Sequence, residues 1–308
     1  MTGVLSPFRH DALLYDSEAE YLAGTVPFVR AGLDAGEPVL VVVAPDRIAL
    51  LRAALGSDSG RVHFADMRQL GVNPARIIPA WADFLADAAA DGRPVRGIGE
   101  PVWAGRTAPE LAEAQLHEAL LNRAFGGRPG FWLRCPYDVL ALPPEVVTEA
   151  HRSHPVVTQG DDAEHHPAVA HGTLAGPLPE PAAVAATFPF QCSALPAVRE
   201  LVREHASRAG LGDDPARRMV LAVHEAAANS VRHGGGLGVL RIWVEAGALV
   251  CEVTDSGWIA EPLAGRVRPL QRSGGGRGLW IINQLCDLAQ LRSAPGGTVV
   301  RMYQRTGA

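Results

Sequence analysis

The chain has 308 residues, which is enough for two domains that each have a hydrophobic core. Its 47% hydrophobic residues, 20% charged residues and net charge of −5 are typical of a globular protein without general affinity for nucleic acid. All 28 basic residues are arginine, which excludes a Walker A loop, a classical protein kinase and a Schiff-base enzyme, since each needs a lysine. We expect a cytoplasmic protein without a membrane anchor, because there is no signal-peptide pattern, no long apolar run and no paired cysteine motif.

Residues 1–157 alternate short apolar runs with helical patterns, which is typical of βαβ units. The run at residues 38–44 is apolar throughout, as expected for a strand that is covered on both faces. The pattern predicts an α/β domain with a mostly parallel sheet and helices on its faces. Helices are predicted at residues 16–35, 46–55, 74–90, 108–125 and 144–151, and strands at residues 38–44, 61–65, 94–99 and 131–135.

Candidates for a sensor pocket lie where predicted strands of this domain end. Ligands of parallel sheets bind beyond the carboxyl ends of the strands. Glu100, Trp103, Cys135 and Tyr137 end or follow two of these strands, and the same positions would suit loops that cap the sheet. Residues 44–47, Ala-Pro-Asp-Arg, follow another strand but cannot cradle phosphate as a glycine-rich P-loop does.

Residues 158–185 are rich in proline, glycine, alanine and acidic side chains without any period, so we expect a linker there. Residues 186–308 follow a different pattern, in which helices accompany hairpins, and this predicts an α+β sandwich with an antiparallel sheet. Helices are predicted at residues 195–209, 215–233 and 279–285, and strands at residues 187–191, 238–245, 248–254, 288–293 and 298–304.

The helix at residues 215–233 carries a carboxylate and an amide one turn apart, Glu225 and Asn229. Helical spacing places the pair roughly opposite the apolar face of the same helix. On a rigid helix, the two side chains could bind a hydrated divalent cation and orient a water molecule. A solvated helix face would show the same pair, so the interpretation depends on the motifs that follow.

Three later motifs fit a nucleotide. Asp255 ends a strand, where its carboxylate could accept the exocyclic amine of adenine while Gly257 lets the base approach. A glycine-rich loop, residues 274–278, precedes a helix whose N-terminal amides could hold phosphate. Thr298 begins the last strand and could join the hydrogen bonds around the base.

In this order, the motifs HEAAANSVRHGG, DSG, GGGRGLWIINQLCD and GGT resemble the ATP-binding Bergerat fold of the GHKL superfamily. The form without a phosphotransfer helix pair is similar to the anti-sigma-factor serine kinases. The resemblance implies bound ATP and Mg²⁺, with Glu225 activating the nucleophile, Asn229 as the metal ligand and Asp255 reading adenine. One departure is Ile259, which stands where the first glycine motif often has a second glycine. The resemblance implies a nucleotide site at Asn229, His233, Asp255, Gly257, Gly274, Gly276, Arg277, Gly278, Leu279 and Thr298.

Three stretches of residues 8–157, HDALLYDSEAEYLAGTVPFVRAGLDAGEPVLVVV, VRGIGEPVW and CPYDVLALPPEVVTEAHRSHPVV, resemble a MEDS domain. This is a sensory module similar to RecA-like ATPase domains that have lost the phosphate loop. Together, the two resemblances imply an ATP-dependent protein serine/threonine kinase that sequesters a sigma factor and phosphorylates a STAS-type antagonist under control of a small-molecule signal. They do not fit an autophosphorylating histidine kinase, and similar kinases often pair as homodimers. Two alternatives stay open: a nucleotide-gated binding module without catalysis, and a small-ligand sensor acting through the N-terminal domain.

Overall fold

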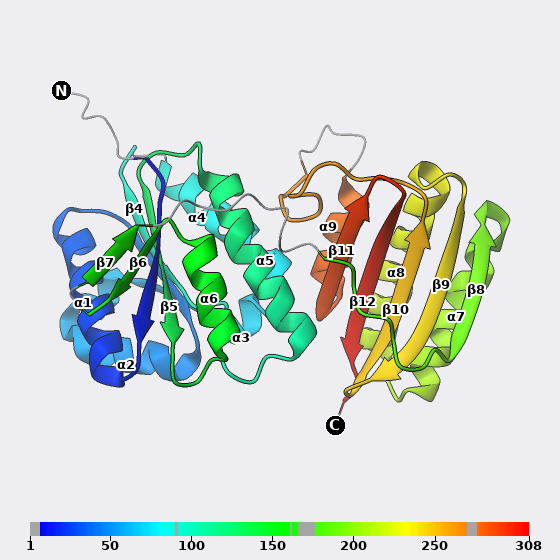
Figure 1. Ribbon diagram of the computed structural model, residues 1–308, viewed down its shortest axis with the longest axis horizontal. Helices are drawn as coiled ribbons and strands as arrows, with labels where there is room; N and C mark the ends of the chain where they lie inside the picture. Colours follow the sequence, from blue (N-terminus) through cyan, green and yellow to red (C-terminus); the bar gives the residue numbers. More distant parts are fainter. Residues whose placement is uncertain (1–6, 90–91, 161, 166–175, 270–275, 308) are drawn as a thin grey trace. The chain divides into compact units, whose positions relative to one another are not determined.

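The computed structural model describes residues 7–89, 92–160, 162–165, 176–269 and 276–307. Contacts between Cα atoms divide the chain into two compact units, Met1–Leu174 (unit 1) and Ala175–Ala308 (unit 2), shown in Figure 1. Each unit has its own sheet and its own hydrophobic core. Among the described helices, none is both long enough and apolar enough to cross a membrane.

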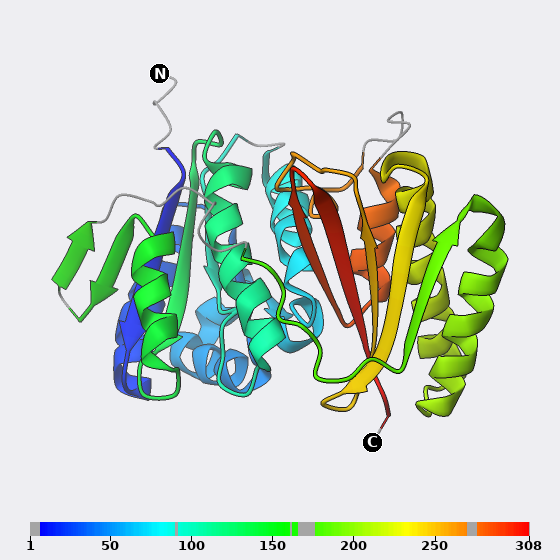
Figure 2. The ribbon, with the colours of Figure 1, turned by 45° about the vertical axis from the view of Figure 1, so that its right-hand side comes forward.

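Unit 1 is built on a seven-stranded sheet with the order β3-β2-β4-β5-β1-β6-β7, in which only β6 and β7 pair antiparallel. The predicted mostly parallel sheet is therefore confirmed. Helices α1 and α2 cover one face of the sheet and share a core with it, while α4 and α5 lie on the other face (Figures 1 and 2). There, Trp81 of α4 and Phe125 of α5 contact Phe131 of β5. The elements are β1 (Arg9–Tyr15), α1 (Glu18–Asp34), β2 (Val39–Val43), α2 (Pro45–Leu55), β3 (His63–Asp66), α3 (Met67–Leu70), α4 (Ile77–Ala89), β4 (Val95–Gly99), α5 (Ala108–Phe125), β5 (Phe131–Asp138), α6 (Pro144–Ser153), β6 (Val156–Gln159) and β7 (Asp162–His165).

Strand β1 lies between β5 and β6, although the first strand that the sequence predicts is at residues 38–44. Its first residues include His10 and Asp11, whose polarity conceals the strand pattern, yet both are buried. Asp11 accepts a hydrogen bond from Trp132 Nε1, and its Oδ2 lies 3.5 Å from the guanidinium of Arg134. Partners more than 100 residues away therefore stabilise the buried carboxylate of Asp11.

Helix α4 packs closely on the sheet because two glycines of β4 leave room for Trp81. A Cβ atom on Gly97 would lie 2.8 Å from the Trp81 ring, and one on Gly99 would lie 3.2 Å away. Trp81 is almost completely buried and also contacts Phe131, with ring centroids 5.7 Å apart. A larger residue at position 97 would push this helix from the sheet.

The predicted linker, residues 158–185, differs from the structure at both ends. Its first residues lie in the β6–β7 hairpin, which extends the sheet of unit 1 beyond β1. Near its other end, the carbonyl of Pro179 accepts a hydrogen bond from Arg301, and Glu180 forms an ion pair with Arg241. Because these bonds fix the segment through residues far along the chain, its composition gives no sign of them.

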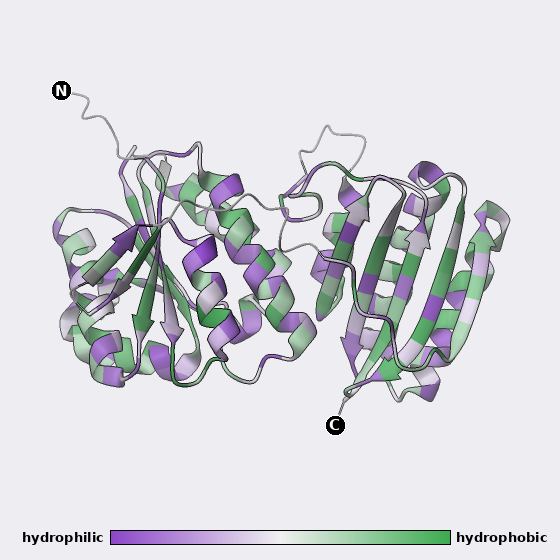
Figure 3. Cartoon of the chain, viewed as in Figure 1, coloured by the Kyte–Doolittle hydropathy of each residue, from purple (hydrophilic) through white to green (hydrophobic). Residues whose placement is uncertain are grey.

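Unit 2 is an antiparallel sheet with the order β11-β12-β10-β9-β8, and its helices pack on one face. The predicted α+β sandwich is confirmed. The strands carry both hydrophobic and hydrophilic residues (Figure 3), and from Gly238 to Ile242 of β9 buried positions alternate with partly exposed ones, as expected for a sheet with one face in a core. The elements are β8 (Ala186–Gln191), α7 (Leu195–Arg208), α8 (Asp213–His233), β9 (Leu237–Glu245), β10 (Ala248–Asp255), α9 (Arg277–Leu285), β11 (Leu288–Ala294) and β12 (Gly297–Arg305).

Candidate functional site

Helix α8 presents Glu225 and Asn229 to the first turn of α9. A Cβ atom on Gly278 would lie 2.8 Å from Asn229 Nδ2 and 3.2 Å from Glu225 Oε2. The sequence analysis places this pair opposite the apolar face, but both side chains are half-buried. The reason is that α8 contacts α7, α9 and three strands, so that more than one of its sides is covered. Its buried residues are Met219, Ala222, Val223, Ala226, Ala227 and Ser230.

The N-terminus of α9 has the geometry of an anion site. Gly276 precedes the helix with φ of 85°, a left-handed conformation that glycine adopts without strain. The first amides of a helix have no partner within the helix and carry partial positive charge, so they favour phosphate. Arg277, in the same turn, is exposed. Gly274, also predicted to belong to this loop, lies outside the described residues.

Asp255, the last residue of β10, is held by two hydrogen bonds from opposite sides. Its Oδ1 accepts from the backbone amide of Gly257 at 2.8 Å, and its Oδ2 accepts from the Ser230 hydroxyl at 2.6 Å. A Cβ atom on Gly234 would lie 2.4 Å from the Asp255 carboxyl carbon, so only glycine fits there. The carboxylate is thus fixed in direction while it keeps lone pairs for a further donor.

Thr298 connects the loop after β10 to the last two strands. Its hydroxyl donates to the carbonyl of Gly257 at 2.8 Å and lies 2.7 Å from the hydroxyl of Ser293. Ser293 in turn accepts a hydrogen bond from the amide of Ile259 at 2.7 Å. This chain of hydrogen bonds fixes the backbone on both sides of Gly257, although Ile259 replaces the glycine that often occurs there.

A cavity of about 370 Å³ lies among these elements, within the usual size range of small-ligand pockets. It joins Asp255 and Thr298 at one end to Asn229 and the first turn of α9 at the other. Of the predicted residues, Glu225 and Arg277 do not line the cavity, although Glu225 borders Gly278. Its lining residues are Ala226, Asn229, His233, Gly234, Asp255, Gly257, Trp258, Ile259, Ala264, Gly276, Gly278, Leu279, Thr298 and Val300.

Three residues that support this site escape sequence reasoning. Ser230 and Ser293 contribute single hydroxyls, which are too common in proteins to signal a site. Gly234 lies in the motif HEAAANSVRHGG without an assigned role in the site, whereas a Cβ atom on it would collide with the Asp255 carboxylate. The only sequence signal for Ser230 is its position one residue after Asn229, on a helix turn that faces β10.

If unit 2 binds Mg-ATP as the motifs imply, replacing Gly278 with alanine is expected to weaken that binding by roughly tenfold, because the new methyl group must displace the amide of Asn229. Alanine favours a helix over glycine by about 0.5–1 kcal/mol, so the melting temperature should stay level or rise. Calorimetric titration and thermal melting measure the two effects. Gly212→Ala is the matched control, since its Cβ would meet only Pro215 at 3.9 Å. Unchanged binding in Gly278→Ala would contradict the predicted role of Asn229 as a metal ligand.

The four predicted sensor-pocket residues do not converge. Cys135 and Tyr137 lie with His154 on the face of the sheet that α5 and α6 cover. Glu100 instead accepts a hydrogen bond from Tyr15 at 2.9 Å, within the α1 and α2 layer. The register of β4 and β5 explains the split, because Ile98 pairs with Arg134 and the faces alternate from there. Trp103 is partly exposed and stacks under the guanidinium of Arg106 at 3.6 Å.

Burial raises the pKa of Glu100 to about 7. In the folded state Glu100 therefore holds its proton at a higher pH than in the unfolded chain. Its contribution to the free energy of unfolding is fully present below the ordinary carboxyl pKa and is lost as pH rises through 7. We expect the loss to be roughly 2–3 kcal/mol between about pH 5 and pH 8, and to be absent in Glu100→Gln. Hydrogen exchange of amides in β1 and β4 measures it. The exposed Glu145→Gln serves as control, and equal pH dependence in Glu100→Gln would refute the expectation.

Two family models match the chain. Residues 9–155 match MEDS, the methanogen/methylotroph, DcmR sensory domain, and residues 188–304 match the histidine kinase-like ATPase domain. A comparison with curated proteins gives no match.

Among solved structures, the SiaB-SiaC complex from Pseudomonas aeruginosa is 12% identical over 39% of this chain and 89% of that chain, with a TM-score of 0.31. The RsbU and RsbW domains of a Mycobacterium tuberculosis protein are 18% identical over 66% of this chain and 49% of that chain, with a TM-score of 0.30. The Acinetobacter baumannii histidine kinase AdeS is 16% identical over 40% of this chain and 68% of that chain, with a TM-score of 0.25. Similarity at this level carries no argument about function. From the family matches, the chain combines a MEDS domain at residues 9–155 with a histidine kinase-like ATPase domain at residues 188–304.

Proposed function

We propose that unit 2 binds Mg-ATP in the cavity between α8, α9 and β10 and transfers the γ-phosphoryl group to a serine or threonine hydroxyl of a protein. The observation that carries the proposal is the spacing of two kinds of group along one cavity. A fixed carboxylate, Asp255, and the amide of Asn229 both line the cavity, and Glu225, which does not line it, lies near Asn229 at Gly278 in the first turn of α9. The first suits an exocyclic amine, and the second suits phosphate and a divalent cation.

The residues at the phosphate end fit a metal-bound triphosphate. Gly278 leaves the space that a Cβ atom would fill, directly beside Asn229. Asn229 Oδ1 would hold Mg²⁺, which when bound neutralises charge on the phosphate oxygens. The amides of the first turn of α9 would orient the terminal phosphate, and Gly276 lets the backbone approach it.

Glu225 is the proposed general base. Its carboxylate would take the proton of the attacking hydroxyl while the bond from the γ-phosphorus to the bridging oxygen of ATP breaks, leaving phosphoprotein and ADP. Catalysis of phosphoryl transfer depends mostly on the positioning of the reactants and on neutralisation of the phosphate charge. A single general base beside the anion site is therefore sufficient. The site needs no lysine, consistent with a chain that has none.

The proposed partners are a sigma factor, held by unit 2, and a STAS-type antagonist, which receives the phosphate. This assignment rests on the resemblance of the motif order to the anti-sigma-factor serine kinases. A histidine kinase has its phosphotransfer helices just before its ATPase domain. The described residues 176–185, which precede β8, contain no helix, and this supports the assignment. We propose that the MEDS domain adjusts this exchange in response to a small molecule.

Incubation of the full chain with ATP labelled at the γ-phosphate and a panel of STAS-type proteins tests the proposal. Label should appear on a serine or threonine of one antagonist, only in the presence of Mg²⁺. Tight ATP binding by calorimetry without transfer to any antagonist would favour the nucleotide-gated binding module instead. No heat of ATP binding would overturn both.

A further inference from the structure

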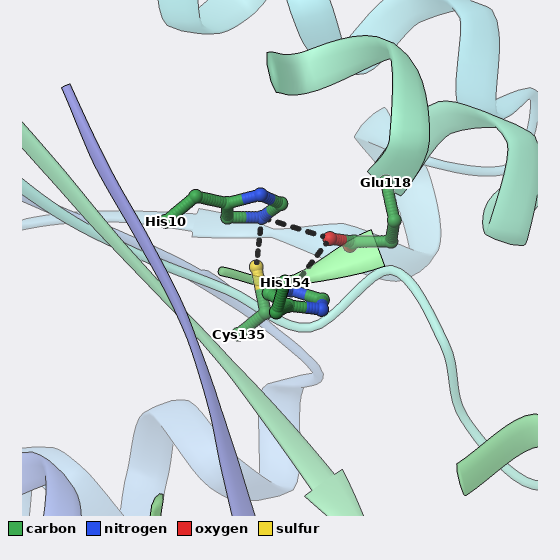
Figure 4. Close-up of side chains that lie close together, drawn as sticks. All are labelled: His10, Glu118, Cys135 and His154. Carbon is green, nitrogen blue, oxygen red and sulfur yellow. Dashed lines mark hydrogen bonds and ion pairs between the residues drawn. The ribbon is translucent and has the colours of Figure 1, made fainter. Parts of the chain in front are cut away.

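A second group of functional side chains is buried within unit 1, on the α5 and α6 face of the sheet. His10 of β1, Glu118 of α5, Cys135 of β5 and His154, which follows α6, all have ligand atoms within 4.8 Å of one another (Figure 4). The side chains are at most 2% exposed. Strands β1 and β5, helix α5 and the segment after α6 therefore direct two imidazoles, a carboxylate and a thiol to one point.

The protons of the two imidazoles are fixed on the side away from this point. His154 Nδ1 lies 2.9 Å from the carbonyl of Ala150, which can only accept, so that nitrogen carries a proton. Asn122 donates its amide to the carbonyl of Ser153 at 2.7 Å and so turns its oxygen to His10 Nδ1 at 3.1 Å. When both rings are neutral, each Nε2 is therefore unprotonated, and its lone pair faces the centre of the cluster.

At the centre of the cluster, hydrogen-bond acceptors therefore outnumber hydrogen-bond donors. His10 Nε2 and His154 Nε2 lie 3.1 Å and 3.2 Å from Glu118 Oε2. Among the described residues, neither His154 Nε2 nor Glu118 Oε1 has a hydrogen-bond partner, since the geometry at His154 does not meet that of a hydrogen bond. Only the thiol of Cys135, 3.4 Å from His10 Nε2, can donate. Buried acceptors facing one another are unfavourable unless a proton or a cation lies between them.

We propose that these four side chains bind one Zn²⁺ ion. The four donors, two imidazole nitrogens, one carboxylate oxygen and one thiolate, are a set that zinc accepts in tetrahedral sites. Ligand bonds of about 2.0–2.3 Å place neighbouring donors of a tetrahedron roughly 3.3–3.6 Å apart. The three contacts of 3.1–3.4 Å are close to that spacing. On binding, the Cys135 thiol loses its proton to solvent and becomes the thiolate ligand.

The surroundings match those of metal-bound histidines. Such residues usually donate their second ring nitrogen to a carbonyl or carboxylate, which fixes the tautomer. Asn122 Oδ1 and the carbonyl of Ala150 occupy these positions here. The site is closed, since all four positions are filled by protein, which is typical of structural zinc. The ion would cross-link β1 and β5 to α5 and to the segment that leads into β6.

The test uses the full chain, stripped with a chelator and titrated first with Zn²⁺ and then, as a spectroscopic substitute, with Co²⁺. We expect one zinc ion per chain by elemental analysis, and a sulfur-to-cobalt charge-transfer band together with the strong visible bands of a tetrahedral site. These measurements on the natural sequence do not depend on whether any variant folds. The absence of stoichiometric zinc, or cobalt binding without the charge-transfer band, would overturn the proposal.

Variants then assign the ligands. Cys135→Ser should remove the charge-transfer band and weaken zinc binding on the order of a hundredfold or more, and Asn122→Ala should weaken it by roughly 10–100-fold while the band persists. Cys251→Ser is the matched control, since Cys251 is also free and completely buried, but in unit 2. If Cys135→Ser kept both the band and the affinity, the site would lie elsewhere. Because the readout is metal bound to unit 1, its failure is separate from any failure of ATP binding in unit 2.

Discussion

Replacing Asp255 with asparagine is expected to weaken ATP binding by roughly 10–100-fold while the fold of unit 2 persists. The carboxylate accepts from Gly257 and Ser230 with one oxygen each, so both oxygens point in fixed directions. Asparagine keeps the bond from Gly257 with its oxygen but presents two protons where the second carboxylate oxygen accepts. Ser230 can turn its hydroxyl to accept from that amide, whereas an adenine amine would meet another donor. Loss of a hydrogen bond to a charged group costs about 1.5–3 kcal/mol, which gives the stated range.

The same substitution should reduce the preference for ATP over GTP. Guanine has a carbonyl where adenine has the amine, and a carboxylate repels that carbonyl while an amide can donate to it. Calorimetric titration with both nucleotides measures the two affinities. Asp287→Asn is the matched control, because Asp287 likewise accepts two hydrogen bonds, from Gln304 and from the amide of Arg305, but does not line the cavity. Equal ATP affinity in Asp255→Asn and the natural chain would mean that the base binds elsewhere.

Replacing Glu225 with glutamine is expected to lower the rate of phosphate transfer by roughly 10²–10⁴-fold and to leave ATP affinity within about threefold. Removal of a general base typically has an effect of that size. Glutamine has the shape of glutamate, so the packing of this side chain near Gly278 should be maintained. The two variants are therefore expected to differ: Asp255→Asn should affect binding, whereas Glu225→Gln should affect the chemical step.

Single-turnover transfer from labelled ATP to the antagonist is the measurement for Glu225, with calorimetry for the affinity. Glu200→Gln on α7 is the control, since Glu200 is an exposed glutamate paired with Arg203. Transfer at the natural rate in Glu225→Gln would show that the base is another group. A large loss of ATP affinity in the same variant would show that Glu225 is part of the binding site instead.

Much of the architecture could be predicted, because local patterns determine it. The apolar run of β2 and the helical spacing of α8 indicate elements that the structure confirms. Strand β1 could not be predicted in this way, since His10 and Asp11 interrupt its pattern and their partners lie on β5 and α5. The β6–β7 hairpin could not be predicted for a related reason: β6 pairs with β1, and the composition of the hairpin itself does not indicate strands.

The two candidate sites differ in what the sequence reveals about them. The nucleotide site follows motifs in which glycines and acids have a fixed local spacing, and Asn229, Asp255 and Gly278 do meet at one cavity. The proposed zinc ligands have no such spacing, because His10 and His154 are 144 residues apart and the four ligands come from β1, α5, β5 and the segment after α6. The predicted sensor pocket failed to assemble because strand register, which no local pattern encodes, places Glu100 and Cys135 on opposite faces.

The sequence by itself determined the two fold classes, the exclusion of lysine-dependent chemistry and the order of the nucleotide motifs, since periodicity, composition and local spacing express all three. Only the tertiary structure decided which faces of α8 are covered, how the linker segment is held and which side chains of unit 1 converge. The physical reason is that these features depend on strand register and on contacts between residues remote in the chain. Such contacts bury and orient polar groups whose positions no local pattern can specify.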